Sequence, residues 1–346
     1  MYTIFQIAEA VNGTIDGNPE LPIKGVSDIK NSCPEHLSYI ISEKYEELIH
    51  KSKATAMLVG NDFTIDRGAK TLIYVENPAI SFIDVIHLFH PKESPIEQIH
   101  SSAIIPPTVE MGENIHIAPH VVCEENIKIG DGVRIGAGTC IGKNTTINNG
   151  SHIYSNVNIY HDVEIGKNCI IDSGSVIGAD GFGLVKDNNS HHKMPHIGGV
   201  VIEDNVWIGS NCCIDRGTFN NTIIGEGSKL DNLIHIAHNV QIGKNCVIAG
   251  QVGIAGSSVL EDNVTLAGQV GIVGHLTMGK GSIVAAKSAV YQSIESGSFV
   301  SGIPARPHKD RLRQDVVVNQ LPNILNRIRK LEKEFSIIED NNCDKR

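Results

Sequence analysis

The stretch Asp231–Val240 holds the densest group of side chains in this sequence that are suited to acid–base chemistry. A histidine side chain titrates close to neutral pH, so the second histidine of this stretch, His238, is a candidate general base. Gly256 lies further along the chain, and a glycine N–H that no side chain obstructs is suited to hold an oxyanion. His275 is a third candidate. Together these residues predict a reaction that passes through an oxyanion.

A hexapeptide repeat of apolar residues surrounds these candidates. An aliphatic, methionine or cysteine side chain recurs at every sixth position from Ile105 to Ile177, from Ile202 to Ile214, and from Ile224 to Val290. Glycine often follows, as in Ile129-Gly130. Because neither an α-helix nor a single strand has this period, the step of six predicts a solenoid of stacked hexapeptides.

Each hexapeptide is expected to form one short strand and one corner, with the apolar residue pointing inward. Three hexapeptides close a triangular coil, and the coils stack about 4.8 Å apart as a parallel β-helix. Since Gly256 follows His238 by three hexapeptides, which is one complete coil, it is predicted to lie directly over His238. His275 is predicted to lie roughly two coils beyond His238.

Two interruptions break the phase of the repeat. Neither the step from Ile177 to Ile202 nor the step from Ile214 to Ile224 is a multiple of six. The excess residues must leave the prism as loops, and loops on a rigid scaffold commonly carry function. We expect a functional role for both loops; the alternative is that each is a tolerated insertion.

The flanking segments lack the period. Residues 1–98 are predicted to form a small α/β domain, with helices at 5–11 and 80–89 and buried strands at 54–59 and 71–75. The β-helix is assigned to 99–305 and a C-terminal helical extension to 306–346. A heptad stripe predicts that helix, and it comprises Ile324, Ile328, Leu331, Phe335 and Ile338. Residues 306–333 hold eight Lys or Arg against three acids, which indicates a solvated face or a docking surface for an acidic partner.

Composition excludes several classes of partner. The formal charge of −10 argues against nucleic acid, which needs clustered Lys and Arg. Without a CxxC pair, the repeat cysteines Cys140, Cys169 and Cys246 are interpreted as small apolar residues in a reducing, cytoplasmic compartment. Neither a signal peptide nor an apolar run of roughly 20 residues, the length of a transmembrane segment, is visible.

Metal binding is the competing use of the histidines. The γ-class carbonic anhydrases resemble this architecture and bind zinc through histidines at subunit interfaces. His235 and His238 are three positions apart, and on a β-helix edge such side chains need not converge as on a helical turn. We therefore predict no metal site.

With these residues in view, nearly the whole chain resembles the UDP-3-O-acylglucosamine N-acyltransferases of lipid A assembly. The specific stretches are Gly178-Ala179-Asp180-Gly181-Phe182-Gly183, Ile214-Asp215-Arg216-Gly217, Asp231-Asn232 with Ile236-Ala237-His238-Asn239-Val240, and Ser301-Gly302-Ile303-Pro304. The resemblance implies a left-handed β-helix and a homotrimer with active sites between subunits. It also implies that His238 is the catalytic base, Gly256 the oxyanion donor and His275 a second active-site histidine, with Asp231 and Asn232 binding substrate.

The same resemblance implies a uridine site in the N-terminal domain. The segment His36–Tyr45 looks like the one that holds uracil between aromatic rings, with Tyr39 and Tyr45 as the stacking residues. Ser42, where some members carry Asn, is assigned to the same substrate site. Without the resemblance, both tyrosines would be ordinary packing residues.

The implied reaction moves a (3R)-3-hydroxyacyl group from acyl carrier protein to the 2-amino group of UDP-3-O-(3-hydroxyacyl)-glucosamine. No bound cofactor is expected, because the phosphopantetheine arrives on the carrier protein. Two alternatives stay open at this point. One is a different hexapeptide acyltransferase, either the O-acyltransferase of the first lipid A step or an acetyl-CoA-dependent N-acetyltransferase. The other is a non-catalytic β-helix that serves as a scaffold.

Overall fold

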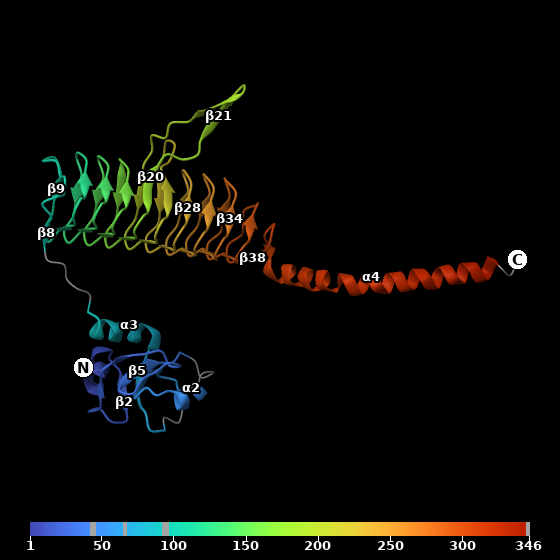
Figure 1. Cartoon of the computed structure of the whole chain (residues 1–346), viewed down its shortest axis with the longest axis horizontal. Coiled ribbons are helices and arrows are strands. Elements are labelled where there is room, and N and C mark those ends of the chain that lie inside the picture. The colour runs from blue at the N-terminus through green and yellow to red at the C-terminus, as the bar shows by residue number, and fades with distance from the viewer. Residues whose placement is uncertain (42–45, 65–67, 92–96, 344–346) are drawn as a thin grey trace. The chain divides into compact units, whose positions relative to one another are not determined.

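The computed structural model describes residues 1–41, 46–64, 68–91 and 97–343. The chain divides into two compact units, Met1–Ser94 and Pro95–Arg346 (Figure 1). Each unit has a hydrophobic core of its own.

The first unit is a five-stranded sheet with helices beside it. Its strand order is β2 (Thr14–Asp16), β7 (Thr71–Val75), β6 (Ala56–Gly60), β5 (His36–Tyr39) and β4 (Gly25–Val26), parallel except for the β2–β7 pair. The other elements are β1 (Tyr2–Thr3), α1 (Ile4–Ala10), β3 (Pro22–Ile23), α2 (Glu46–Lys51) and α3 (Pro78–Phe89). Thr3 caps α1 in a capping box, and Asn77 caps α3. The two predicted helices and the two predicted strands are confirmed.

The second unit is a left-handed parallel β-helix with three faces. The first face comprises β8 (Gln98–Ile99), β10 (His116–Ile117), β13 (Arg134–Ile135), β16 (His152–Ile153), β19 (Ile170–Ile171), β24 (Trp207–Ile208), β27 (Lys229–Leu230), β30 (Val247–Ile248), β33 (Thr265–Leu266), β36 (Ile283–Val284) and β38 (Phe299–Ser301), with β39 (Arg306–Pro307) antiparallel to β38.

The second face comprises β11 (Val122–Cys123), β14 (Cys140–Ile141), β17 (Asn158–Ile159), β20 (Val176–Ala179), β25 (Cys213–Asp215), β28 (His235–Ile236), β31 (Gly253–Ile254), β34 (Gly271–Ile272) and β37 (Ala289–Val290). The third face comprises β9 (Glu110–Met111), β12 (Lys128–Ile129), β15 (Thr146–Ile147), β18 (Val163–Ile165), β23 (Val200–Ile202), β26 (Thr222–Ile224), β29 (Gln241–Ile242), β32 (Val259–Leu260) and β35 (Thr277–Met278).

The register confirms the coil predicted from the repeat. Except in the shorter last coil, where Ile283 pairs with Phe299, partners on one face are separated by three hexapeptides wherever no loop intervenes, as in Ile236 with Ile254 and Ile254 with Ile272. The repeat isoleucines point inward and form one continuous core. Met111 is 43 % exposed because β9 is the terminal strand of its face.

The repeat cysteines follow the prediction only in part. Cys169 and Cys246 are buried as predicted, but Cys140 is exposed. Cys140 precedes the inward Ile141, so the alternation of a strand turns its side chain outward.

Many corners carry a residue with positive φ, most often asparagine. Asn tolerates the left-handed conformation better than other residues that have a side chain. Three such residues, Asn239, Ser257 and His275, follow one another at intervals of one coil and form one column.

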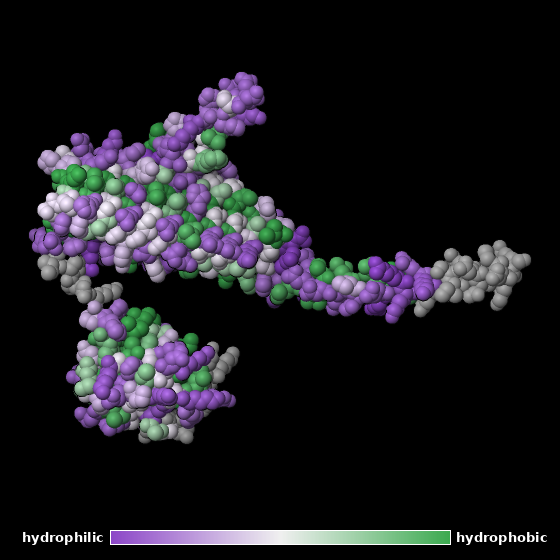
Figure 2. Space-filling model, in the orientation of Figure 1, coloured by the Kyte–Doolittle hydropathy of each residue, from purple (hydrophilic) through white to green (hydrophobic). Residues whose placement is uncertain are grey.

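Both interruptions of the repeat leave the prism as loops. The first contains the hairpin of β21 (Leu184–Asp187) and β22 (Ser190–Lys193), which projects from the prism and is largely hydrophilic (Figures 1 and 2). The second follows β25, and the N–H groups of Ile197 and Gly198 donate to the carbonyls of Thr218 and Gly217 at 2.9 and 3.0 Å. Backbone hydrogen bonds therefore connect the two loops.

Helix α4 (His308–Cys343) follows the last coil and confirms the predicted C-terminal helix. It presents exposed apolar side chains, among them Val317, Leu321, Leu325 and Ile328. Figure 2 shows hydrophobic, green atoms on the surface of this helix. Among the described residues, no helix is both long and apolar enough to cross a membrane.

Candidate active site

His238 and Gly256 lie in neighbouring coils, as their spacing in the repeat predicts. His238 follows β28 at a corner, and the pairing of Ile236 with Ile254 places Gly256 beside it. A Cβ built on Gly256 would lie 2.6 Å from both Cε1 and Nε2 of the His238 ring. The imidazole edge therefore occupies the space that any other residue at position 256 would fill.

The backbone of Gly256 leaves one donor free beside that edge. Its carbonyl accepts from the His275 N–H at 3.1 Å, whereas its own N–H donates to no acceptor within the described ranges. A free N–H beside a neutral imidazole is the combination that acyl transfer through a tetrahedral oxyanion requires.

Asn239 determines which nitrogen of His238 carries the proton. Its Oδ1 accepts from the Thr218 N–H at 2.9 Å, and its Nδ2 donates to the Asn220 carbonyl at 3.1 Å. The amide is thus held with Oδ1 facing Nδ1 of His238, 3.1 Å away. Because this oxygen can only accept, Nδ1 of His238 carries the hydrogen and Nε2 keeps its lone pair towards Gly256.

His275 lies two coils beyond Asn239 rather than above His238 itself. It occupies the left-handed column of Asn239 and Ser257, with φ of 63°, and its side chain is exposed. The structure brings its backbone to Gly256 through one hydrogen bond. A chemical role for its imidazole stays a prediction.

Asp231 and Asn232 belong to a different corner of the prism. Strand β28 separates them from His238, and their side chains bind the backbone of neighbouring coils. Asp231 accepts from the Gly250 N–H at 3.0 Å, and Asn232 accepts from the Ser210 N–H at 2.7 Å. A groove of about 530 Å³ runs along this corner, and Asn232 is among the residues that line it. Their predicted contact with substrate stays a prediction.

The first loop adds two residues to the site, and neither of them was assigned a role from the sequence. His196 is 5 % exposed, and its ring meets that of His238 edge-on, with centroids 5.3 Å apart. Gly181 lies against both histidines, since a Cβ there would be 2.8 Å from His238 Cβ and 2.9 Å from His196 Nε2. The Gly178–Gly183 stretch was the available signal, but its contact with His238 depends on how the loop folds.

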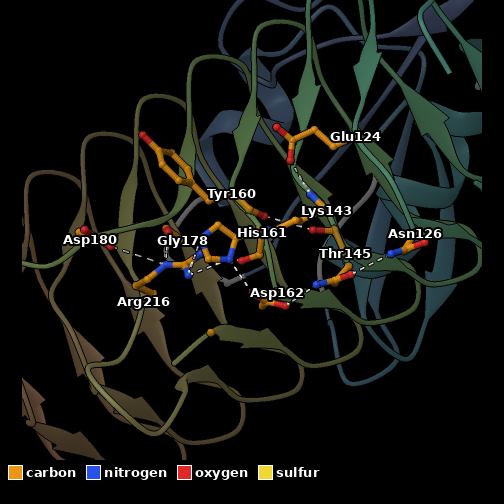
Figure 3. A network of polar contacts seen from close by, with 12 residues as sticks. Glu124, Asn126, Lys143, Thr145, Tyr160, His161, Asp162, Gly178, Asp180 and Arg216 are labelled. Carbon is orange, nitrogen blue, oxygen red and sulfur yellow. Dashed lines mark hydrogen bonds and ion pairs between the residues drawn. The ribbon is translucent and has the colours of Figure 1, made fainter. Parts of the chain in front are cut away.

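Arg216 holds the base of both loops. Its side chain is fully buried, its Nε donates to the Gly178 carbonyl at 2.7 Å, and its Nη2 donates to the His161 carbonyl at 2.6 Å. Asp180 Oδ1 lies 4.0 Å from Nε, and Asp162 binds the His161 ring. Figure 3 shows the guanidinium at the centre of this network.

Replacing Arg216 with methionine is expected to lower the free energy of unfolding by roughly 3–5 kcal/mol, because one buried and one partly buried carbonyl lose a charged donor. Denaturant unfolding and amide exchange of residues 178–199 measure the effect. Arg313→Met is the control, since Arg313 is exposed on α4 and its ion pair with Asp310 is worth about 0–1 kcal/mol. Equal effects of the two substitutions would contradict the assignment.

Comparison with known proteins adds the family. A model described as UDP-3-O-(3-hydroxymyristoyl) glucosamine N-acyltransferase, LpxD, matches residues 20–88, and bacterial transferase hexapeptide repeats match 144–179 and 221–256. A Coxiella burnetii protein named UDP-3-O-acylglucosamine N-acyltransferase is 38 % identical over 334 residues, covering 96 % of this chain and 97 % of its own. This chain belongs to the UDP-3-O-acylglucosamine N-acyltransferase family. Relatives of the same name from Methylacidiphilum infernorum and Porphyromonas gingivalis are each 42 % identical, and cover 96 % and 98 % of this chain and 95 % and 97 % of their own.

A solved structure supports the fold assignment. The Arabidopsis UDP-N-acetylglucosamine acyltransferase is 25 % identical, with a TM-score of 0.50 over 63 % of this chain and 77 % of its own. The N-acyltransferase family makes this chain an acyltransferase enzyme. This family membership excludes the alternative of a non-catalytic β-helix that serves as a scaffold.

In this N-acyltransferase the tyrosine segment lies within the region that matches the family model. Tyr39 ends β5, is partly buried, and stacks on Phe82 of α3 with centroids 4.5 Å apart. One face of its ring is therefore occupied by Phe82. Ser42 and Tyr45 lie outside the described residues.

Proposed function

We propose that this enzyme transfers a (3R)-3-hydroxyacyl group from acyl carrier protein to the 2-amino group of UDP-3-O-(3-hydroxyacyl)-glucosamine, in lipid A biosynthesis. The family name supplies the reaction class. The observation that carries the mechanism is the free N–H of Gly256 one coil away from the lone pair of His238 Nε2.

In the proposed step the sugar nitrogen attacks the thioester carbonyl, and His238 Nε2 takes a proton from that nitrogen. The carbonyl oxygen becomes an oxyanion, which the Gly256 N–H stabilises. Collapse of the intermediate forms the amide and breaks the carbon–sulfur bond, and the imidazolium of His238 returns its proton to the departing thiolate. The step needs no bound cofactor and no metal.

The carrier protein and the trimer are part of the same proposal. Arg306 of β39, together with Lys309, Arg311 and Arg313 of α4, gives this end of the prism a basic surface suited to an acidic carrier protein. The exposed apolar residues of α4 are suited to packing against the same helix of two further copies. Since both substrates, the UDP-sugar and the acylated carrier protein, are cytoplasmic, we place the enzyme in the cytoplasm.

A direct assay tests this function. Purified enzyme is supplied with 3-hydroxyacyl carrier protein and UDP-3-O-acylglucosamine, and the product is identified by mass spectrometry. We expect the N-acylated sugar nucleotide and a free carrier-protein thiol in equal amounts. No product with this acceptor, but turnover of UDP-N-acetylglucosamine or acetyl-CoA, would support another hexapeptide acyltransferase instead.

Replacing Asn239 with alanine is expected to lower kcat on the order of 10²-fold with little change in KM, because the His238 ring loses the acceptor that sets its tautomer. Asn245→Ala is the matched control. Asn245 also has positive φ, 53°, so its substitution carries the same backbone strain without touching the site. A similar loss in both variants would assign the effect to strain.

Replacing Tyr39 with alanine is expected to raise the acceptor KM roughly tenfold or more, because base–aromatic stacking is worth about 1–3 kcal/mol. Tyr39→Phe retains the ring and its contact with Phe82 and should leave KM unchanged. The measurement is initial rate against acceptor concentration. An unchanged KM in the alanine variant would make Tyr39 a packing residue alone.

A further inference from the structure

The proposed mechanism gives His238 a positive charge in a partly buried setting, yet its hydrogen-bond partner carries none. Asn239 orients the imidazole through a neutral amide oxygen. An imidazolium is stabilised by an ionised carboxylate within a few ångströms, which a neutral amide replaces only in part. The negative charge that balances the His238 imidazolium must therefore come from another residue.

Asp215 occupies the neighbouring coil on the same face as the catalytic corner. It is the last residue of β25, and the pairing of Ile214 with Ile236 places it beside Ala237, the residue before His238. The side chain is 9 % exposed. Its Oδ2 lies 3.8 Å from His235 Nε2, and no N–H or O–H group in the described part of the chain donates a hydrogen bond to its carboxylate.

Burial raises the pKa of the Asp215 carboxyl, and the nearby His235, His238 and His196 oppose that shift when protonated. Asp180 adds to the rise, although it is itself paired with Lys193 at 2.7 Å. These groups come from β28, from the catalytic corner and from the first loop. A buried carboxylate that lies 3.8 Å from one histidine, interacts electrostatically with two more and lacks a hydrogen-bond donor costs folding free energy, so its presence calls for a functional reason.

We propose that Asp215 is the counter-charge of His238: a positioning residue, placed one coil away, that stabilises the imidazolium formed during acyl transfer. The inference rests on the proposed role of His238 as base. In many catalytic pairs a single carboxylate both orients the histidine and balances its charge. Here two residues share these tasks. Asn239 fixes the tautomer, and Asp215 supplies the charge.

The test compares Asp215→Asn with the unmodified enzyme, and Asp131→Asn serves as the control because Asp131 is an exposed carboxylate in a distant coil. We expect kcat about 10-fold lower in Asp215→Asn, an unchanged acceptor KM, and the acid limb of the kcat–pH profile about one unit lower. The NMR titration of His238, assigned with a His238→Gln sample, should show the same fall in its pKa without any turnover. Thermal stability near pH 8 should be unchanged or higher, because the substitution removes a buried charge.

Two results would overturn the proposal. One is a lower kcat with no movement of the acid limb or of the His238 titration, which would make Asp215 a structural residue. The other is a loss of stability that accounts for the loss of activity. Failure of the proposed function is recognised separately, because His238→Ala would then retain activity. The NMR comparison measures the Asp215–His238 coupling whether or not His238 is the catalytic base.

Discussion

Replacing His238 with alanine is expected to lower kcat by about 10²–10⁴-fold, the range that a general base contributes. The alanine leaves the attacking amine without an acceptor for its proton and the thiolate without a donor. The acceptor KM should change little, because His238 acts on the reacting atoms. The measurement is steady-state product formation with both substrates near saturation.

His191→Ala provides the control, since His191 is exposed on the projecting hairpin. It should retain the full rate. Turnover of His238→Ala at the unmodified rate would remove the proposed mechanism. Partial recovery of the alanine variant by added imidazole would support a base at that position.

Replacing Gly256 with alanine is expected to lower kcat by about 10²–10³-fold, because the base and the oxyanion donor can no longer act on the same reacting carbonyl. The reason is steric: the new Cβ would lie 2.6 Å from Nε2 and Cε1 of His238, so the ring must move away from the free N–H. The peptide N–H itself remains, but the base no longer stands beside it.

Gly253→Ala is the matched control for this substitution. It lies in the same coil, and a Cβ there meets nothing within 4 Å. Its rate should stay within about twofold of the unmodified enzyme, since the added methyl group contacts no other atom. Comparable kcat values for the two alanine variants would show that contact between position 256 and the His238 ring has no bearing on the rate.

The period of the sequence predicted the prism and the stacking of Gly256 on His238, because a repeat of fixed length converts spacing along the chain into position in space. The same logic located the two loops by their excess length. It could not predict what the loops touch. The hydrogen bonds of Asn239 to Thr218 and Asn220, and the contact of His196 with His238, depend on backbone conformations that no repeat specifies.

Proximity in the sequence predicted which residues are neighbours in space less well than the hexapeptide period did. Asp231 and His238 fall within one short stretch, yet the strand between them places the two residues at different corners. Asp215 is far from His238 in sequence and lies in the adjoining coil. Cys140 was misassigned for a related reason, since only every second residue of a strand faces the core.

The stacked register of His238 and Gly256 limits how this catalyst can be adjusted. The backbones that carry the base and the oxyanion donor are one coil apart, about 4.8 Å, and the hydrogen-bond ladder keeps this spacing constant. Moving either residue to another coil changes that separation in whole steps, so small corrections along the prism axis are not available. Substrates of different shape must therefore be accommodated by the loops and corners. The spacing between the coils of His238 and Gly256 stays the same as between any other two adjoining coils.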